Sequence, residues 1–110
     1  MKKALVPEKA VLKVITQYLE LRGILYIRHH PLRMTGEAGN LIPVMGSKSQ
    51  LGAPDVIVFH CDQVLAVECK SSIGKLSDNQ IKWQDAFGFA MPKNGRYIIA
   101  RGLEDIYPYI

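Results

Sequence analysis

The 110-residue chain is poor in cysteine and has no long apolar run. Its two cysteines, Cys61 and Cys69, have neither the number nor the spacing of a zinc site or a disulfide framework, which favours a reducing, cytoplasmic environment. No apolar stretch is long enough to cross a membrane. The apolar residues that follow the charged start of the chain end at Pro7, so no secretory signal peptide is predicted.

Motifs of several large enzyme classes are also missing. The sequence has no Gly-rich phosphate loop of the P-loop or Rossmann type, no nucleophile elbow, and no cysteine with a histidine placed to activate it. What it does have is 48% hydrophobic residues, enough for one core without disulfides, and a net charge of +4. We therefore expect a single domain over residues 1–110, with a weak preference for a polyanionic partner.

Apolar periodicity predicts an α/β fold in which a small mixed sheet is flanked by helices. The expected elements are a helix at 7–22, a strand at 24–29, two strands at 52–59 and 64–70, a helix at 77–89, a strand at 96–100 and a helical turn at 103–107. Residues 31–51 predict a long loop, with an apolar interlude at 41–45.

The ends and inner faces of both helices are also predicted. Gly23 is expected to end the first helix and Ser77 to cap the second. Helical spacing predicts inner faces that include Val11, Val14, Ile15, Tyr18, Leu19 and Arg22 on the first helix, and Ile81, Trp83 or Gln84, Phe87 and Gly88 on the second.

Two acidic residues lie in the strands that form the expected hairpin. A symmetric turn pairs Phe59 with Val64 and so places Asp55 opposite Glu68, with Cβ atoms about 5 Å apart. Lys70 follows Glu68 by two residues and shares its face. Opposed carboxylates repel each other and destabilise a sheet unless a cation lies between them, and a divalent metal suits oxygen ligands. The group predicts a metal-dependent phosphodiesterase site.

Simpler interpretations of the same residues stay open. Asp55 also fits a turn at the start of a strand, and Glu68 also fits an ion pair with Lys70 on a solvated face. Against the second interpretation, Glu68 lies in an apolar run, where an unpaired carboxylate costs several kcal/mol or takes up a proton. Cys69 points away from the acidic face and is expected to be a buried structural thiol.

Further candidates lie outside the hairpin. Gln80, with Gln84 as its competitor, is expected to hydrogen-bond the attacking water or a phosphate oxygen. Glu8 opens the first helix, either as an additional metal ligand or as a simple N-terminal charge. Basic residues are expected to contact phosphates, with solvated surface as the alternative for each: Arg28, His29, His30, Arg33, Lys48 and Lys75. His29 and His30 do not form a metal-binding pair, because adjacent strand residues point in opposite directions.

Pro54-Asp55 together with Glu68-Cys69-Lys70 resembles the motif of the PD-(D/E)XK nuclease superfamily. Over nearly its whole length the chain resembles a stand-alone VRR-NUC domain of the type found in phages and bacteria. The most specific part of this resemblance is the stretch Gly74-Lys75-Leu76-Ser77-Asp78-Asn79-Gln80. Ala53 departs from the pattern, in which a polar or bulkier residue is usual.

The resemblance implies a restriction-endonuclease-like core and a site that binds Mg²⁺ or Mn²⁺. Asp55, Glu68 and the main-chain carbonyl of Cys69 would hold the cation, with Glu8 as the acid from the first helix. Lys70 would lie near the nucleophilic water and Gln80 would support the site. A homodimer that cuts duplex or branched DNA, in a bacterial cell or a phage-infected host, is also implied.

We therefore predict a metal-dependent, structure-selective deoxyribonuclease. One alternative is a nucleic-acid-binding or assembly module that keeps the fold without cutting. A second is a restriction-type endonuclease, which the short length disfavours. The sequence leaves open whether DNA or RNA is cut and where a dimer would form, with Leu41, Ile42, Val44 and Met45 as candidates for that interface.

Overall fold

The predicted α/β class is confirmed by a computed structural model, which describes residues 6–29 and 51–110 and the backbone of 33–35 and 41–43. The elements are α1 (Glu8–Arg22), β1 (Leu25–Arg28), β2 (Arg33–Thr35), β3 (Leu41–Pro43), β4 (Val56–His60), β5 (Gln63–Cys69), α2 (Asp78–Ala90), β6 (Gly95–Ala100) and the 3₁₀ helix η2 (Leu103–Asp105).

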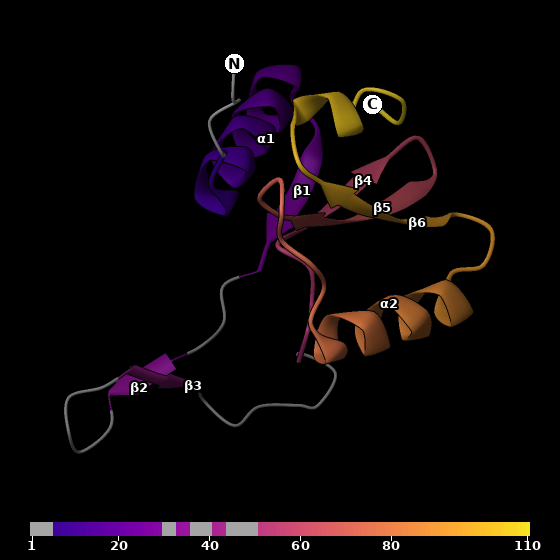
Figure 1. Ribbon diagram of the computed structural model, residues 1–110. Coiled ribbons are helices and arrows are strands. Elements are labelled where there is room, and N and C mark those ends of the chain that lie inside the picture. The colour runs from indigo at the N-terminus through magenta and orange to yellow at the C-terminus, as the bar shows by residue number, and fades with distance from the viewer. Residues whose placement is uncertain (1–5, 30–32, 36–40, 44–50) are drawn as a thin grey trace.

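A mixed sheet with the strand order β1-β4-β5-β6 forms the centre of the molecule. The pairs β1–β4 and β4–β5 are antiparallel, and β5–β6 is parallel. A parallel pair needs a crossover connection, which α2 supplies. Helix α1 and η2 lie on one side of the sheet and α2 lies on the other (Figure 1).

The loop predicted at 31–51 is only partly correct. Within it, β2 and β3 pair antiparallel as a separate two-stranded sheet. The apolar interlude at 41–45 marks β3, but the three residues of β2 are too few for an alternating pattern to reveal its partner. Two predicted nucleic-acid contacts, His30 and Lys48, lie outside the described residues, as do the side chain of Arg33 and the candidate interface side chains at 41–45.

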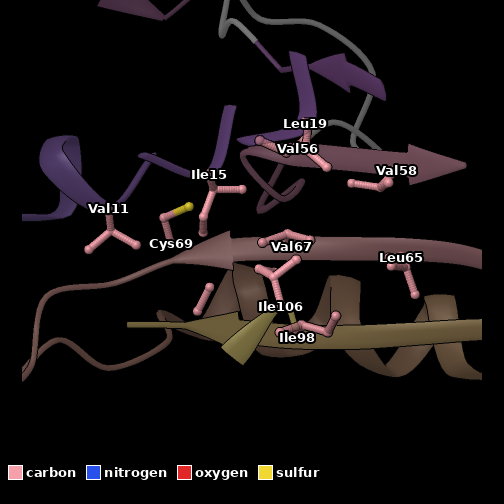
Figure 2. Close-up of a cluster of buried hydrophobic side chains, with 11 residues drawn as sticks. Val11, Ile15, Leu19, Val56, Val58, Leu65, Val67, Cys69, Ile98 and Ile106 are labelled. Carbon is pink, nitrogen blue, oxygen red and sulfur yellow. The ribbon is translucent and has the colours of Figure 1, made fainter. Parts of the chain in front are cut away.

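The hydrophobic core lies between α1 and the sheet (Figure 2). Val11, Ile15 and Leu19 are buried at helical spacing, as predicted, and α1 ends at Gly23 with a φ of 65°. Val14 and Arg22 are exposed, so the predicted apolar stripe was too wide. The strands contribute the alternate residues that point toward α1: Val56, Val58, Leu65, Val67, Cys69, Ile98 and Ala100.

Helix α2 packs more loosely and has no fully buried residue. Trp83 stacks on Phe87 with 5.3 Å between ring centroids and lies 6.2 Å from the ring of Tyr97 on β6. These rings determine the inner face. The prediction that Ile81 and Gly88 belong to that face was wrong, because both are exposed.

Two turns fix the parts of the chain that matter for the site. Cys61 and Asp62 both have positive φ, 49° and 65°, which is the geometry of a two-residue hairpin turn. It pairs Phe59 with Val64, as predicted. Gly52 has a φ of 77°, and a Cβ there would clash with the main-chain oxygen of Asn79. The segment that leads into β4 therefore packs directly against the first turn of α2.

Candidate metal centre

The acidic side chains gather at one end of the sheet, where β1 and β5 finish and β4 begins. Val56 pairs with Val67, so the same register carried one residue further places Asp55 opposite Glu68. On the other side of β4, Arg28 pairs with Val56, and the main-chain N–H of His29 donates to the carbonyl of Asp55 at 2.9 Å. Because directly opposed residues share a face, His29, Asp55 and Glu68 form one row across three strands.

Glu8 joins this row from the first turn of α1. One carboxylate oxygen from each of Glu8, Asp55 and Glu68 lies within 4.8 Å of the others. Glu8 is exposed, Asp55 is half-buried and Glu68 is buried, so the cluster runs from solvent into the sheet. The structure therefore brings together the three acids that the sequence analysis names as candidate metal ligands. Their spacing allows one ion to contact all three side chains.

The carboxylate of Glu68 is held at one oxygen and unpartnered at the other. Its side chain is only 2% exposed. Oε1 accepts a hydrogen bond from Gln80 Nε2 at 2.7 Å and lies 3.6 Å from Lys70 Nζ. Oε2 is buried and has no hydrogen-bond partner within the described part of the chain. A buried carboxylate oxygen without a partner costs free energy, so this atom requires a ligand or a proton.

The electrostatics of the site agree with that requirement. Burial, together with the negative charges of Asp55 and Glu8, raises the pKa of Glu68 from 4.5 to about 7, while Lys70 opposes the rise. The charge of the nearby ammonium group is therefore too small to keep Glu68 fully ionised at neutral pH. A divalent cation would do so, because it favours the charged form of every carboxylate that it contacts.

Asp55 is oriented by the main chain of β5. Its Oδ2 accepts a hydrogen bond from the N–H of Cys69 at 2.8 Å, which leaves Oδ1 for another ligand. Val64 donates its N–H to the carbonyl of Asn94, directly before β6, and Lys70 donates its N–H to Ala100 on β6, so the even-numbered residues of β5 turn their main-chain groups toward β6. The carbonyl of Cys69 must then face the opposite way, toward Asp55, where the resemblance places a metal ligand.

The thiol of Cys69 has a structural role. It is buried in the core on the α1 side of the sheet, as predicted (Figure 2). Burial, together with the neighbouring carboxylates, raises the pKa of the thiol to about 12. The thiol therefore stays protonated at neutral pH, on the face away from the acids, and only the main chain of Cys69 is available to the site.

Gln80 links the start of α2 to the acidic row. Ser77 and Gln80 form a capping box, in which Ser77 Oγ accepts from the N–H of Gln80 and Gln80 Oε1 accepts from the N–H of Ser77 at 2.8 Å. The other end of the same amide donates to Glu68. The structure thus gives Gln80 a contact with a carboxylate, and the predicted contact with water or phosphate stays a prediction.

Lys70 is brought to Glu68 but lies deeper than expected. Its side chain is 11% exposed. The pair is not the solvated ion pair that formed the alternative interpretation, because both residues are buried. Lys70 is not among the residues that line the pocket at the acids.

That pocket has a volume of about 330 Å³ and is called the acidic pocket below. It is lined by Glu8, His29, Leu51, Gly52, Ala53, Asp55, Glu68, Ser77, Asn79 and Gln80. Sequence reasoning did not place His29 at the acids, because its position depends on the pairing of β1 with β4. The signal that was available is its place at the end of a predicted strand, next to Arg28.

Two predicted nucleic-acid contacts can be placed. Arg28 is exposed and lines a second pocket, which adjoins the acidic pocket. Lys75 is exposed on the segment between β5 and α2 and lines neither pocket.

Comparisons with known proteins add no assignment. No protein-family model matches the chain, and no curated protein or solved structure matches it either. Within the described residues, no helix has the length and apolar character needed to span a membrane.

Proposed function

We propose that the protein is a metal-dependent nuclease that hydrolyses DNA phosphodiester bonds, with selectivity for branched, flap or junction structures. One observation carries the proposal: Glu68 Oε2 is buried with no hydrogen-bond partner among the described residues, inside a cluster of three carboxylates whose ligand atoms lie within 4.8 Å of one another. The donor set consists of oxygen atoms only, which suits Mg²⁺ or Mn²⁺.

Each residue of the site has a separate role in the proposed hydrolysis. Asp55, Glu68 and Glu8 would hold the cation, and the carbonyl of Cys69 faces the same position. When bound, the cation supplies Lewis-acid polarisation of the scissile phosphate and a lowered pKa for water. Gln80 holds Glu68 in place as a positioning residue. Lys70 sets an ammonium group beside the acids, where it offsets negative charge that develops on the phosphate.

A cleavage assay with matched variants tests this proposal. Labelled duplex, flap and four-way-junction DNA, and the corresponding RNA, are incubated with Mg²⁺, Mn²⁺ or EDTA. We expect cleavage only with metal, and a loss of at least about 100-fold for Asp55→Ala, since a cation that polarises the phosphate contributes several kcal/mol. Asp85→Ala is the control, because Asp85 is an exposed acid on α2. Equal cleavage by wild type and Asp55→Ala would refute the assignment.

The binding-module alternative predicts a different outcome of the same assay. It requires DNA binding that does not depend on metal and gives no product. The buried, unpartnered oxygen of Glu68 favours the nuclease, because a module that only binds DNA gains nothing from a carboxylate that destabilises its own fold.

The homodimer implied by the resemblance is also part of the proposal. Leu25, Ile27 and Phe59 are exposed on the sheet face that carries the acidic row, and the register makes them neighbours. Exposed apolar patches of this kind mark interfaces. Sedimentation should show a dimer for wild type and a monomer for Leu25→Glu/Phe59→Glu; a wild-type monomer at all concentrations would remove the dimer from the proposal.

A further inference from the structure

A second pocket, of about 580 Å³, adjoins the acidic pocket on the side of α1. We call it the flanking pocket. It is lined by Pro7, Glu8, Lys9, Leu12, Arg28, His29 and Asp55. Glu8, His29 and Asp55 line both pockets, so the two hollows meet at the acidic row. A chain molecule that lies over the acids can therefore continue directly into the flanking pocket.

The charge of the lining residues differs between the two pockets. Among the residues that the structure describes, the acidic pocket is lined by three carboxylates and by no lysine or arginine. The flanking pocket adds Lys9 and Arg28, which come from α1 and from the end of β1. With a divalent cation bound to Glu8 and Asp55, those two acids are neutralised, and Lys9 and Arg28 then set the sign of the potential in the flanking pocket. That pocket becomes a site for an anion.

The basic residues of the flanking pocket stand beside the acidic row. His29 lies directly opposite Asp55 in the register of β1 and β4, and Arg28 is its neighbour on β1. Arg28 precedes His29 and turns toward α1, where Lys9 and Leu12 lie. A guanidinium group binds a phosphate through two parallel hydrogen bonds. Leu12 and Pro7 offer apolar surface for a sugar.

We propose that the flanking pocket binds the phosphate next to the scissile one, through Arg28 and Lys9. This inference rests on the proposed nuclease function, and it deepens that function by naming a two-phosphate segment as the unit that the site recognises. It also gives the site a direction, because the flanking pocket lies on one side of the acidic row only, toward α1. A phosphate added at one end of a minimal substrate should therefore increase kcat/KM for cleavage, and a phosphate added at the other end should not.

The test uses dinucleoside phosphates of thymidine in three forms: with no terminal phosphate, with a 5′-phosphate and with a 3′-phosphate. Wild-type protein with Mn²⁺ should cleave one of the two phosphorylated forms about tenfold or more faster in kcat/KM than the unphosphorylated form, since a hydrogen bond to a charged group contributes that much. In Arg28→Ala/Lys9→Ala this preference should disappear, so that the three forms are cleaved at similar rates.

Lys93→Ala/Arg96→Ala is the matched control. It removes the same charge from exposed positions in the turn after α2 and on β6, and it should keep the preference. Binding of a single-stranded oligonucleotide with Ca²⁺ gives a second measurement. The slope of log affinity against log salt should become shallower by about 0.7 in the Arg28/Lys9 variant relative to the control, because one neutralised phosphate is lost.

Three outcomes overturn the inference. The first is a wild-type protein that gains nothing from a terminal phosphate at either end. The second is an equal salt dependence of oligonucleotide affinity for the Arg28/Lys9 variant and the Lys93/Arg96 control. The third is an Arg28/Lys9 variant that loses cleavage of all three forms equally, which would place these residues in the metal centre. A wild-type protein that cleaves no nucleic acid at all removes the nuclease proposal itself, a result distinct from these three.

Discussion

Replacement of Glu68 by glutamine in the metal-free protein tests the electrostatics of the centre directly. Folding raises the pKa of Glu68 from 4.5 to about 7, so the folded state favours the protonated acid. The stability that comes with the protonated carboxyl is fully present below pH 4.5. It is lost as the pH rises from 4.5 through 7, because the unfolded chain can ionise freely and the folded chain cannot. Glutamine mimics the protonated acid at every pH.

The size of the effect follows from the same shift. A rise from 4.5 to about 7 corresponds to at most about 3 kcal/mol, and solvent at the mouth of the pocket reduces this to about 1–2 kcal/mol. The carboxamide keeps the acceptor for Gln80 Nε2, so little is lost at that contact. We expect Glu68→Gln to be more stable than wild type by about 1–2 kcal/mol at pH 8, and the two proteins to agree within about 0.5 kcal/mol at pH 5.

Urea unfolding in EDTA at both pH values measures the difference. Glu104→Gln is the control, because Glu104 is an exposed acid on η2. The reasoning fails if wild type is as stable as Glu68→Gln at pH 8, or if the control variant gains as much. With Mn²⁺ at pH 8 the order should reverse. Wild type gains about 2.7 kcal/mol when the metal is at 100 times its dissociation constant, and the variant, which lacks a charged ligand, gains little.

Two further predictions concern the supports of the centre. Gln80→Ala removes the donor to Glu68 and the capping contact with Ser77, so calorimetry should show about 10- to 100-fold weaker Mn²⁺ binding; unchanged affinity would argue against a positioning role. Gly52→Ala places a Cβ against the main chain of Asn79 at positive φ and should destabilise the fold by more than about 2 kcal/mol. Gly88→Ala, with nothing within 4 Å of the added Cβ, should instead stabilise by about 0.5–1 kcal/mol in the same urea titration.

The hairpin that brings Asp55 to Glu68 could be read from the sequence because its register depends on local features. Strand residues alternate between two faces, and a two-residue turn leaves one pairing that buries the apolar face. The pairing of β1 with β4 has no such local determinant, because more than 20 residues separate the two strands. For that reason the place of His29 beside Asp55, and the pocket shared with Arg28, emerged only from the structure.

The role of Gln80 shows a second limit of the sequence. The spacing from Ser77 to Gln80 is that of a capping box, and it locates the start of α2 without tertiary information. Which group the other end of the Gln80 amide contacts depends on how close α2 approaches the sheet. That distance is set by the packing of Gly52 against Asn79 and by the rings of Trp83 and Tyr97, which are long-range contacts.

The position of the acids gives the metal-free fold an electrostatic weakness that the cation would remove. Glu8 and the Gln80 that holds Glu68 both stand in the first turns of their helices, where the helix dipole favours negative charge, so α1 and α2 offset part of the repulsion. The rest of the repulsion acts on Glu68, whose Oε2 has no hydrogen-bond partner in the described part of the chain. If Glu68 had only a structural role, an apolar residue at this position in the strand would make the protein more stable. Its burial is explained when the free energy of metal binding is part of the native state, and in that case occupancy of the centre and stability of the domain must rise together with pH.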